Sequence, residues 1–312
     1  MDNKQKNFVS AVIYVHNDEN TIGEFLTMVR HVLEENFLHS EIICVNDGST
    51  DGSMAEIKKC STEAKTAGIS ILNMSFYHGL ELSMNAGVDL SIGDFVFEFD
   101  SAASDFPPEE IMKVYFHSLE GYDIVSASPE GKQELSSRFF YYIFNKFSHA
   151  TYTMGTERFR ILSRRAINRI SAMNKAIPYR KAVYANSGFD QDTLYYHPIG
   201  GKKEKRTSEE RTYRSRLAID ALLLFTDVGY DLAMAFTGIM MVFTVFTSIY
   251  ALVMYLTSTT ATGWTTTILF LSFAFFCLFG ILTIIMKYLQ IILNLVFRRK
   301  RYTFESIEKL TK

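Results

Sequence analysis

The segment Glu41–Gly52 reads EIICVNDGSTDG and joins an apolar run directly to a polar one. Its first part, Glu41–Val45, is short and rich in Val and Ile, which is typical of a buried strand. Its second part, Asn46–Gly52, consists of the small polar residues and glycines that turns prefer. We therefore predict a strand that ends in a turn carrying carboxylate and hydroxyl groups.

The same strand-like pattern recurs along the first two thirds of the chain, with helix-like apolar spacing in between. The other predicted strands are Phe8–Val15, Ile69–Phe76, Asp94–Phe99 and Tyr122–Ala127. The predicted helices are Thr21–Glu35, Gly52–Ala67, Leu80–Ser91 and Pro108–Leu119. This alternation predicts an α/β fold, a mostly parallel sheet with helices on both faces.

Polar residues follow several of these strands at the point where each strand ends. His16–Asn20 follows the first strand, Asn46–Gly52 follows the second, and Glu98 and Asp100 close the fourth, with Asp105 shortly after. Ligands of parallel sheets bind outside the carboxyl ends of the strands. We therefore expect a ligand site at this edge, although single residues such as Asp51 can instead cap the next helix.

Two long uncharged runs follow the α/β part, Leu232–Leu256 and Trp264–Met286. Each has about the length that crosses a hydrocarbon core of roughly 30 Å, so we predict two transmembrane helices. Arginines precede the first run, and the cluster Arg298–Arg301 follows the second. Because positive charge favours the cytoplasmic side, we expect both termini in the cytoplasm and a multi-pass protein of the cell (inner) membrane.

The predicted organisation has five parts. Residues 1–205 form a cytoplasmic catalytic domain, 206–231 a basic amphipathic juxtamembrane segment, 232–256 and 264–286 the two spans, and 287–312 an interfacial segment with a basic cytoplasmic tail. The composition, 48% hydrophobic with a net charge of −2, excludes a disordered chain and argues against nucleic-acid binding. The three cysteines are too scattered for a zinc site or a disulfide framework.

Several motifs, in order, resemble those of the family-2 glycosyltransferases of the GT-A fold, a Rossmann-like fold, and among them the polyprenyl-phosphate glycosyltransferases of the dolichol-phosphate mannose synthase and bactoprenol glucosyltransferase type. Val45–Asp51 is similar to that family's VDDGSTD, and Asn85–Ala86–Gly87 with Gly93–Asp94 to its A-G-x-x-x-A-x-G-D. Asp100 with Asp105 and Pro107–Glu109 resembles D-x-D-L-Q-D-P-P-E, and Phe159–Arg165 resembles its F-R-L segment. The resemblance covers nearly the whole chain.

The resemblance implies a set of site residues. The donor-binding residues would be Asn17, Glu19, Asp47, Ser49 and Asp100, and the catalytic residues Asp100, Asp105 and Glu157. Asp100 and Asp105 would hold Mg²⁺ or Mn²⁺, and Arg160, Arg211 and Arg214 would hold the acceptor phosphate. Two positions depart from the family pattern: Ala102 replaces the second carboxylate of D-x-D, and Arg158 replaces the Asp that precedes the F-R pair.

We expect an inverting transfer of a sugar from a nucleotide sugar, a UDP-sugar, to a polyprenyl phosphate at the cytoplasmic membrane face. A phosphate monoester has a second pKa near 6, so such an acceptor needs little deprotonation at neutral pH. Two alternatives stay open: an acceptor that is a longer lipid-linked glycan, and a non-catalytic member that binds a nucleotide sugar or a membrane partner. Glycines in the apolar runs, Gly238 and Gly280, would permit association into a homo-oligomer.

Overall fold

A computed structural model describes residues 4–131, 135–148, 152–173, 179–200, 208–226, 264–297 and 302–311, together with parts of 228–246. It contains an eight-stranded sheet of order β7-β5-β6-β4-β1-β2-β3-β8. The strands are β1 (Val9–Val15), β2 (Ser40–Asn46), β3 (Gly68–Met74), β4 (Phe95–Phe99), β5 (Ile124–Pro129), β6 (Phe159–Ser163), β7 (Gln191–Tyr196) and β8 (Phe304–Lys309). All five predicted strands are present.

The central strands β3, β2, β1 and β4 run parallel, and β7 is parallel to β5. Strand β6 lies antiparallel between β4 and β5, and β8 lies antiparallel at the other edge. The prediction of a mostly parallel sheet is therefore confirmed. Long apolar strands such as β1 are buried on both faces, which is the usual condition of a parallel sheet.

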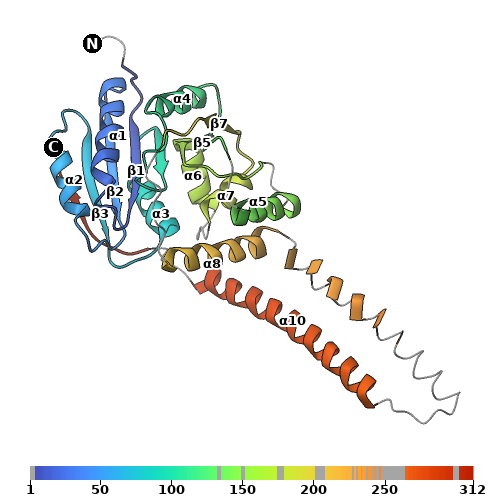
Figure 1. The fold of residues 1–312 in the computed structure, drawn as a ribbon. Coiled ribbons are helices and arrows are strands. Elements are labelled where there is room, and N and C mark those ends of the chain that lie inside the picture. Colours follow the sequence, from blue (N-terminus) through green and yellow to red (C-terminus); the bar gives the residue numbers. More distant parts are fainter. Residues whose placement is uncertain are drawn as a thin grey trace, which may run out of the picture.

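Helices cover both faces of the sheet (Figure 1). Side chains of α1 (Ile22–Asn36), α2 (Ser53–Ser61) and α4 (Glu109–Ser118) pack into the core on one face. Side chains of α3 (Leu80–Leu90), α6 (Arg164–Met173) and α7 (Arg180–Ala185) pack into the core on the other. A smaller cluster joins α5 (Leu135–Phe147) to α8 (Ser208–Phe225).

The helix predicted over Gly52–Ala67 is wrong at its C-terminal end, because α2 stops at Ser61. The reason is a tertiary contact with the neighbouring helix. Glu34 Oε1 of α1 accepts hydrogen bonds from the backbone N–H groups of Lys65, Thr66 and Ala67 at 2.6, 3.0 and 3.3 Å. These amides therefore bond to a side chain in place of the carbonyls that a longer helix would offer them.

The C-terminal third forms an arm and then returns to the sheet. Helix α10 (Trp264–Phe297) runs away from the sheet domain, and α8 lies between the two (Figure 1). It continues without a break through Lys287, which forms an ion pair with Asp220 of α8 at 2.8 Å. Within the stretch predicted as an interfacial segment and basic tail, 287–297 continues α10 and Phe304–Lys309 is strand β8.

None of the helices in the described part of the chain combines the length and the apolar character that crossing a membrane requires. Most of the first predicted span, 232–256, lies outside the described residues. The second, 264–286, falls within α10. Large apolar side chains on α10 lie exposed on the surface of the chain, among them Phe276, Phe279 and Met286.

Candidate functional site

The turns after β1 and β2 are joined to one another by hydrogen bonds. Asn17 N–H donates to Ser49 Oγ at 3.1 Å, and Thr50 N–H donates to Asn17 Oδ1 at 2.8 Å. Gly52 N–H donates to Glu19 Oε2 at 2.9 Å. Asn17 has a φ of 57°, a left-handed conformation that Asn tolerates better than most residues. The structure thus brings together three predicted donor-binding residues, Asn17, Glu19 and Ser49.

Asp47, the fourth residue of the predicted donor group, is completely buried. Its Oδ1 accepts a hydrogen bond from His78 N–H at 2.7 Å, and its Oδ2 accepts from Gly79 N–H at 2.8 Å and from the Tyr14 hydroxyl at 3.0 Å. Both carboxylate oxygens are therefore used inside the protein. Asp47 thereby fixes the loop after β3, and its contact with the donor stays a prediction.

The loop that Asp47 holds, Phe76–Gly79, presents aromatic side chains beside the turn after β1. Phe76 is 62% exposed and its ring stacks on that of His78, with centroids 4.0 Å apart. Tyr77 lies against His16, with ring centroids 4.7 Å apart. Exposed rings next to buried polar anchors are suited to contact a flat ligand group such as a nucleobase.

Two buried arginines meet at the ends of β4 and β6. Arg160 donates to Glu98 Oε2 at 2.8 Å, to Asp100 Oδ2 at 3.0 Å and to Glu157 Oε2 at 3.2 Å. Arg180 of α7 donates to Asp100 Oδ1 at 2.7 Å and to Glu81 Oε2 at 3.1 Å. Asp100 is thereby held between two guanidinium groups that come from different elements.

Glu98 joins the two arginines within this cluster. Arg180 Nη1 lies 2.8 Å from Glu98 Oε2, an ion pair without the alignment of a hydrogen bond. The Tyr184 hydroxyl donates to Glu98 Oε1 at 2.9 Å. Arg180, Glu81 and Tyr184 were not among the residues that the sequence motifs indicate. The sequence feature that could have indicated Arg180 is the charged pair Arg180–Lys181, which interrupts an otherwise apolar segment of helix length.

Asp100 is the carboxylate of this cluster that reaches solvent most. Its side chain is 15% exposed, whereas those of Glu98, Glu81 and Glu157 are 0%, 4% and 7% exposed. Burial alone would raise the pKa of Asp100, but Arg160, Arg180 and Lys181 hold that pKa well below its ordinary value. Asp100 is therefore ionised at neutral pH and offers an anionic oxygen edge at the end of β4.

The two predicted metal ligands, Asp100 and Asp105, meet different partners. Across the described ranges, no three His, Cys, Asp or Glu side chains gather into a ready-made metal site. Mg²⁺ is often held by one or two carboxylates together with substrate phosphates and water, however, and each oxygen of an ionised carboxylate can accept about two partners. Asp100 meets that requirement, since each of its oxygens receives one guanidinium N–H.

Asp105 is engaged elsewhere. Arg158 Nε lies 2.9 and 2.8 Å from its two oxygens, Arg158 Nη2 also donates to Oδ2, and the Tyr196 hydroxyl donates to Oδ1 at 3.5 Å. The replacement noted above, Arg158, supplies this partner. That Asp105 shares a cation with Asp100 stays a prediction.

The predicted acceptor-phosphate residues lie on two elements, β6 and α8. Arg160 is completely buried and is paired with three carboxylates, so it holds Asp100 and Glu157 rather than an external phosphate. Arg211 and Arg214 belong to α8, but their side chains lie outside what the structure describes. The predicted catalytic residue Glu157 accepts from Arg160 beside Asp100, and it is almost entirely buried.

The profile of glycosyl transferase family 2 matches residues 10–184 of this chain, which includes β1 to β4, the β6 arginine and Arg180. The chain belongs to glycosyl transferase family 2. The family membership and the sheet topology agree with the GT-A-like α/β fold that the motifs predict, and they support glycosyltransferase activity.

Named relatives cover the chain to different extents. An uncharacterised glycosyltransferase of Synechocystis sp. is 29% identical over 194 residues, 60% of each chain. An uncharacterised glycosyltransferase of Bacillus subtilis is 26% identical over 272 residues, 83% of this chain and 81% of its own length. An undecaprenyl-phosphate 4-deoxy-4-formamido-L-arabinose transferase of Aeromonas hydrophila is 30% identical over 136 residues, 43% of this chain and 40% of that protein. The chain thus spans less than two thirds of the Synechocystis and Aeromonas proteins.

Solved structures share the fold at low sequence identity. A mannosyltransferase of Pyrobaculum calidifontis, in complex with GDP-mannose and Mn²⁺, superposes with a TM-score of 0.52 at 14% identity, covering 71% of this chain and 64% of that one. Glucosyl-3-phosphoglycerate synthase of Mycobacterium tuberculosis, in complex with phosphoglyceric acid, gives a TM-score of 0.50 at 14% identity over 70% and 79% of the two chains. Nucleotide sugar and Mn²⁺ are thus bound together by a protein of this fold.

Proposed function

We propose that this protein transfers a sugar from a nucleotide sugar, a UDP-sugar, to a polyprenyl phosphate, with inversion at the anomeric carbon. The observation that carries the proposal is the ionised, partly exposed carboxylate of Asp100, held between Arg160 and Arg180 at the carboxyl edge of the sheet. The undecaprenyl-phosphate transferase among the relatives supports a lipid phosphate as acceptor.

The donor would lie across the turns after β1 and β2. Asn17, Glu19 and Ser49 form one side of this region, and the exposed rings of the Phe76–Gly79 loop form the other. The diphosphate would then reach the end of β4. Asp47 contributes by keeping the loop in place, because its carboxylate bonds to the amides of His78 and Gly79.

Mg²⁺ or Mn²⁺ would bind to Asp100 together with the donor phosphates and water. Such an ion supplies Lewis-acid stabilisation of the departing diphosphate. The contribution of the chain is to keep Asp100 ionised and oriented, which Arg160 and Arg180 do from two directions. Two charge-assisted contacts on one carboxylate leave it little rotational freedom, so the oxygen edge is preorganised.

The transfer itself requires no strong base. A phosphate oxygen of the acceptor attacks the anomeric carbon, and the bond from that carbon to the nucleotide diphosphate breaks with its electron pair remaining on the diphosphate. The acceptor is largely dianionic at pH 7 because the second pKa of a phosphate monoester is near 6. Arg211 and Arg214 of α8 are our candidates for holding this phosphate.

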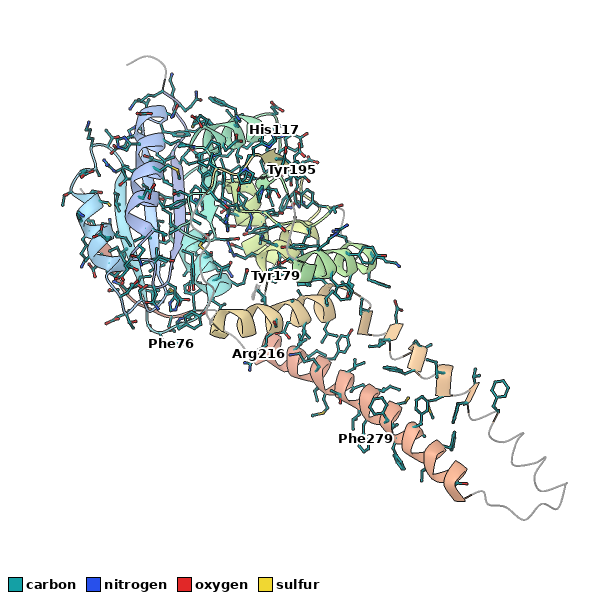
Figure 2. All side chains as sticks on the ribbon, viewed as in Figure 1. Phe76, His117, Tyr179, Tyr195, Arg216 and Phe279 are labelled. Carbon is teal, nitrogen blue, oxygen red and sulfur yellow. The ribbon has the colours of Figure 1, made fainter. Side chains whose placement is uncertain are left out.

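We further propose that the protein acts at the cytoplasmic face of the cell membrane. Supporting this, Phe76 and Tyr179 lie at the end of the domain that faces α8 and the arm, whereas His117 lies at the opposite end (Figure 2). The arm exposes apolar side chains such as Phe279, and α5 exposes Phe139 and Tyr142. The two predicted spans, 232–256 and 264–286, and association into a homo-oligomer belong to this proposal.

The test uses the purified full-length chain in lipid nanodiscs, with undecaprenyl phosphate, a panel of UDP- and GDP-sugars, and Mg²⁺ or Mn²⁺. Lipid products are identified by mass spectrometry. We expect a single sugar-lipid with one donor, and a loss of about 10²-fold or more in rate for Asp100→Asn. Asp105→Asn is the matched control, and we expect it to keep most of the rate because Asp105 is bound to Arg158.

Three results would count against the proposal. Equal losses of rate in Asp100→Asn and Asp105→Asn would indicate that both carboxylates bind the metal ion. Absence of product with every donor, although the protein is folded and binds a nucleotide sugar, would favour a longer lipid-linked acceptor. Absence of both nucleotide-sugar binding and turnover would favour a non-catalytic role. The replacement of the second D-x-D carboxylate by Ala102 is the observation behind that alternative. Thermal melting of each variant separates loss of function from loss of fold.

A further inference from the structure

The C-terminal segment after α10 contacts the same loop that Asp47 holds. Thr303 N–H donates to His78 Nε2 at 3.3 Å, and Thr303 Oγ1 lies 3.3 Å from the same nitrogen. Ser75 N–H donates to the Thr303 carbonyl at 3.2 Å. A residue more than two hundred positions away in the sequence is thus bonded to both ends of the short stretch Ser75–His78.

These contacts indicate which ring nitrogen of His78 carries the proton. A backbone N–H can only donate, so His78 Nε2 must be the acceptor of the bond from Thr303. The proton of the neutral ring is then on Nδ1, which lies 2.5 Å from the Phe76 carbonyl and donates to it. The ring of His78 therefore links Thr303 to the backbone of Phe76, and it also stacks on the Phe76 ring.

Strand β8 anchors Thr303 firmly to the sheet. It pairs with β3 over five residue pairs from Ser70–Lys309 to Met74–Phe304. Asn73 Nδ2 donates to Ser306 Oγ at 3.0 Å and to Glu308 Oε1 at 3.1 Å. Lys58 of α2 lies 2.8 Å from Glu308 Oε2, farther along the strand. The loop is consequently held from beneath by Asp47 and from the side by the C-terminal strand.

We propose that Thr303, carried by the C-terminal segment, is a positioning residue for the nucleoside part of the donor. This inference rests on the proposed function. Thr303 acts through His78, whose backbone amide also bonds to Asp47, and so it sets where the exposed rings of Phe76 and Tyr77 stand. The segment that follows the arm is thereby part of the donor site, and it ties the arm to that site.

The test measures binding of UDP and of GDP to the full-length protein in the presence of Mg²⁺, by calorimetry. His78→Phe keeps a stacking ring without the nitrogen that accepts from Thr303, so it removes both contacts to Nε2. Thr303→Val removes the hydroxyl contact and leaves the backbone N–H of residue 303, and Thr303→Ser keeps both contacts. Glu308→Gln is the control on the same strand, because Glu308 contacts Lys58 and Asn73 and not the loop. Hydrogen exchange of the His78 and Gly79 amides reports the loop itself.

We expect the nucleotide Kd to rise about two- to tenfold for His78→Phe, the range of one lost hydrogen bond, and less for Thr303→Val, which keeps the backbone donor. The double variant should bind no more weakly than His78→Phe, Thr303→Ser and Glu308→Gln should bind as the wild type does, and the two amides should exchange faster in His78→Phe. A Kd in His78→Phe equal to that of the wild type overturns this inference alone. If the wild-type protein binds neither nucleotide, the proposed function falls, and the inference falls with it.

Discussion

Replacing Arg180 with Met tests whether the buried charge cluster is held together as the structure indicates. Arg180 is 1% exposed and faces Glu81, Glu98 and Asp100. Met has a similar length but no charge, so the variant leaves Glu81 without a cation and Glu98 and Asp100 with Arg160 alone. Removing one partner of a buried ion pair costs about 3–5 kcal/mol, because it leaves an uncompensated charge in a medium of low dielectric.

That cost is large enough to measure without ambiguity. For a domain of 150–250 residues, 1 kcal/mol corresponds to roughly 2–4 °C in Tm, so we expect a decrease of about 6–20 °C. The control is Lys58→Met, which removes an ion pair with Glu308 at 2.8 Å in which both side chains are exposed, 51% and 42%. Exposed pairs contribute about 0–1 kcal/mol, so the control should lose no more than about 4 °C.

The assay is thermal unfolding followed by circular dichroism, with nucleotide binding measured on the folded protein. Adding Glu81→Gln to Arg180→Met should restore part of the lost stability, because Glu81 then carries no unpaired charge. Nucleotide affinity should fall in the single variant, since Asp100 loses one of its two guanidinium contacts. Equal melting temperatures for Arg180→Met and Lys58→Met would refute the reasoning.

Three further predictions follow from individual contacts. Gly87→Ala should lose about 1–3 kcal/mol of unfolding free energy in urea, because a Cβ there would lie 2.4 Å from Val12 Cγ1, whereas Gly155→Ala, with open space around it, should not. Tyr14→Phe should lose about 0.5–1.5 kcal/mol of unfolding free energy and raise the nucleotide Kd, since Asp47 keeps only its two backbone donors. An unchanged Kd would indicate that the Phe76–Gly79 loop does not contribute to nucleotide binding. Because the pKa of Asp100 is lower in the folded protein, its stabilising contribution is fully present above the ordinary value of about 3.9 and is lost as the pH falls below it. In acid titrations, Asp100→Asn should therefore lose less stability with falling pH than the wild type does. Titration of Asp100 should not change the reaction rate between pH 5 and 8.

The elements that local pattern decides were predicted well, and those that depend on distant contacts were not. The five predicted strands are present, and the helix predicted over Leu80–Ser91 is observed over Leu80–Leu90. The error at the end of α2 comes from Glu34, a residue on another helix. Strand β8 was missed because Phe304–Lys309 is short and partly polar, and its pairing partner β3 lies more than two hundred residues away.

For the site, sequence motifs indicated the right edge of the sheet but not how its residues are used. Asn17, Glu19, Ser49 and Asp100 follow strand ends, and parallel strands necessarily bring those ends together. The roles of Asp47, Asp105 and Arg160 depend on which partner each side chain meets, and that information is absent from any local window. Arg180 carried no motif, yet it is one of the two arginines that hold Asp100.

The sequence by itself thus determined the family, the alternation of strands and helices, and the position of the polar turns, because these follow from residue periodicity and turn chemistry within short stretches. Only the tertiary structure decided which carboxylates are neutralised and which remain open to a ligand. Burial makes an unsatisfied charge costly, so each of these carboxylates must find a cation or hydrogen-bond donors. Arg158 forms an ion pair with Asp105, and Arg160 and Arg180 both form ion pairs with Asp100. Thr303, just before the C-terminal strand, donates to His78 in the loop that Asp47 holds.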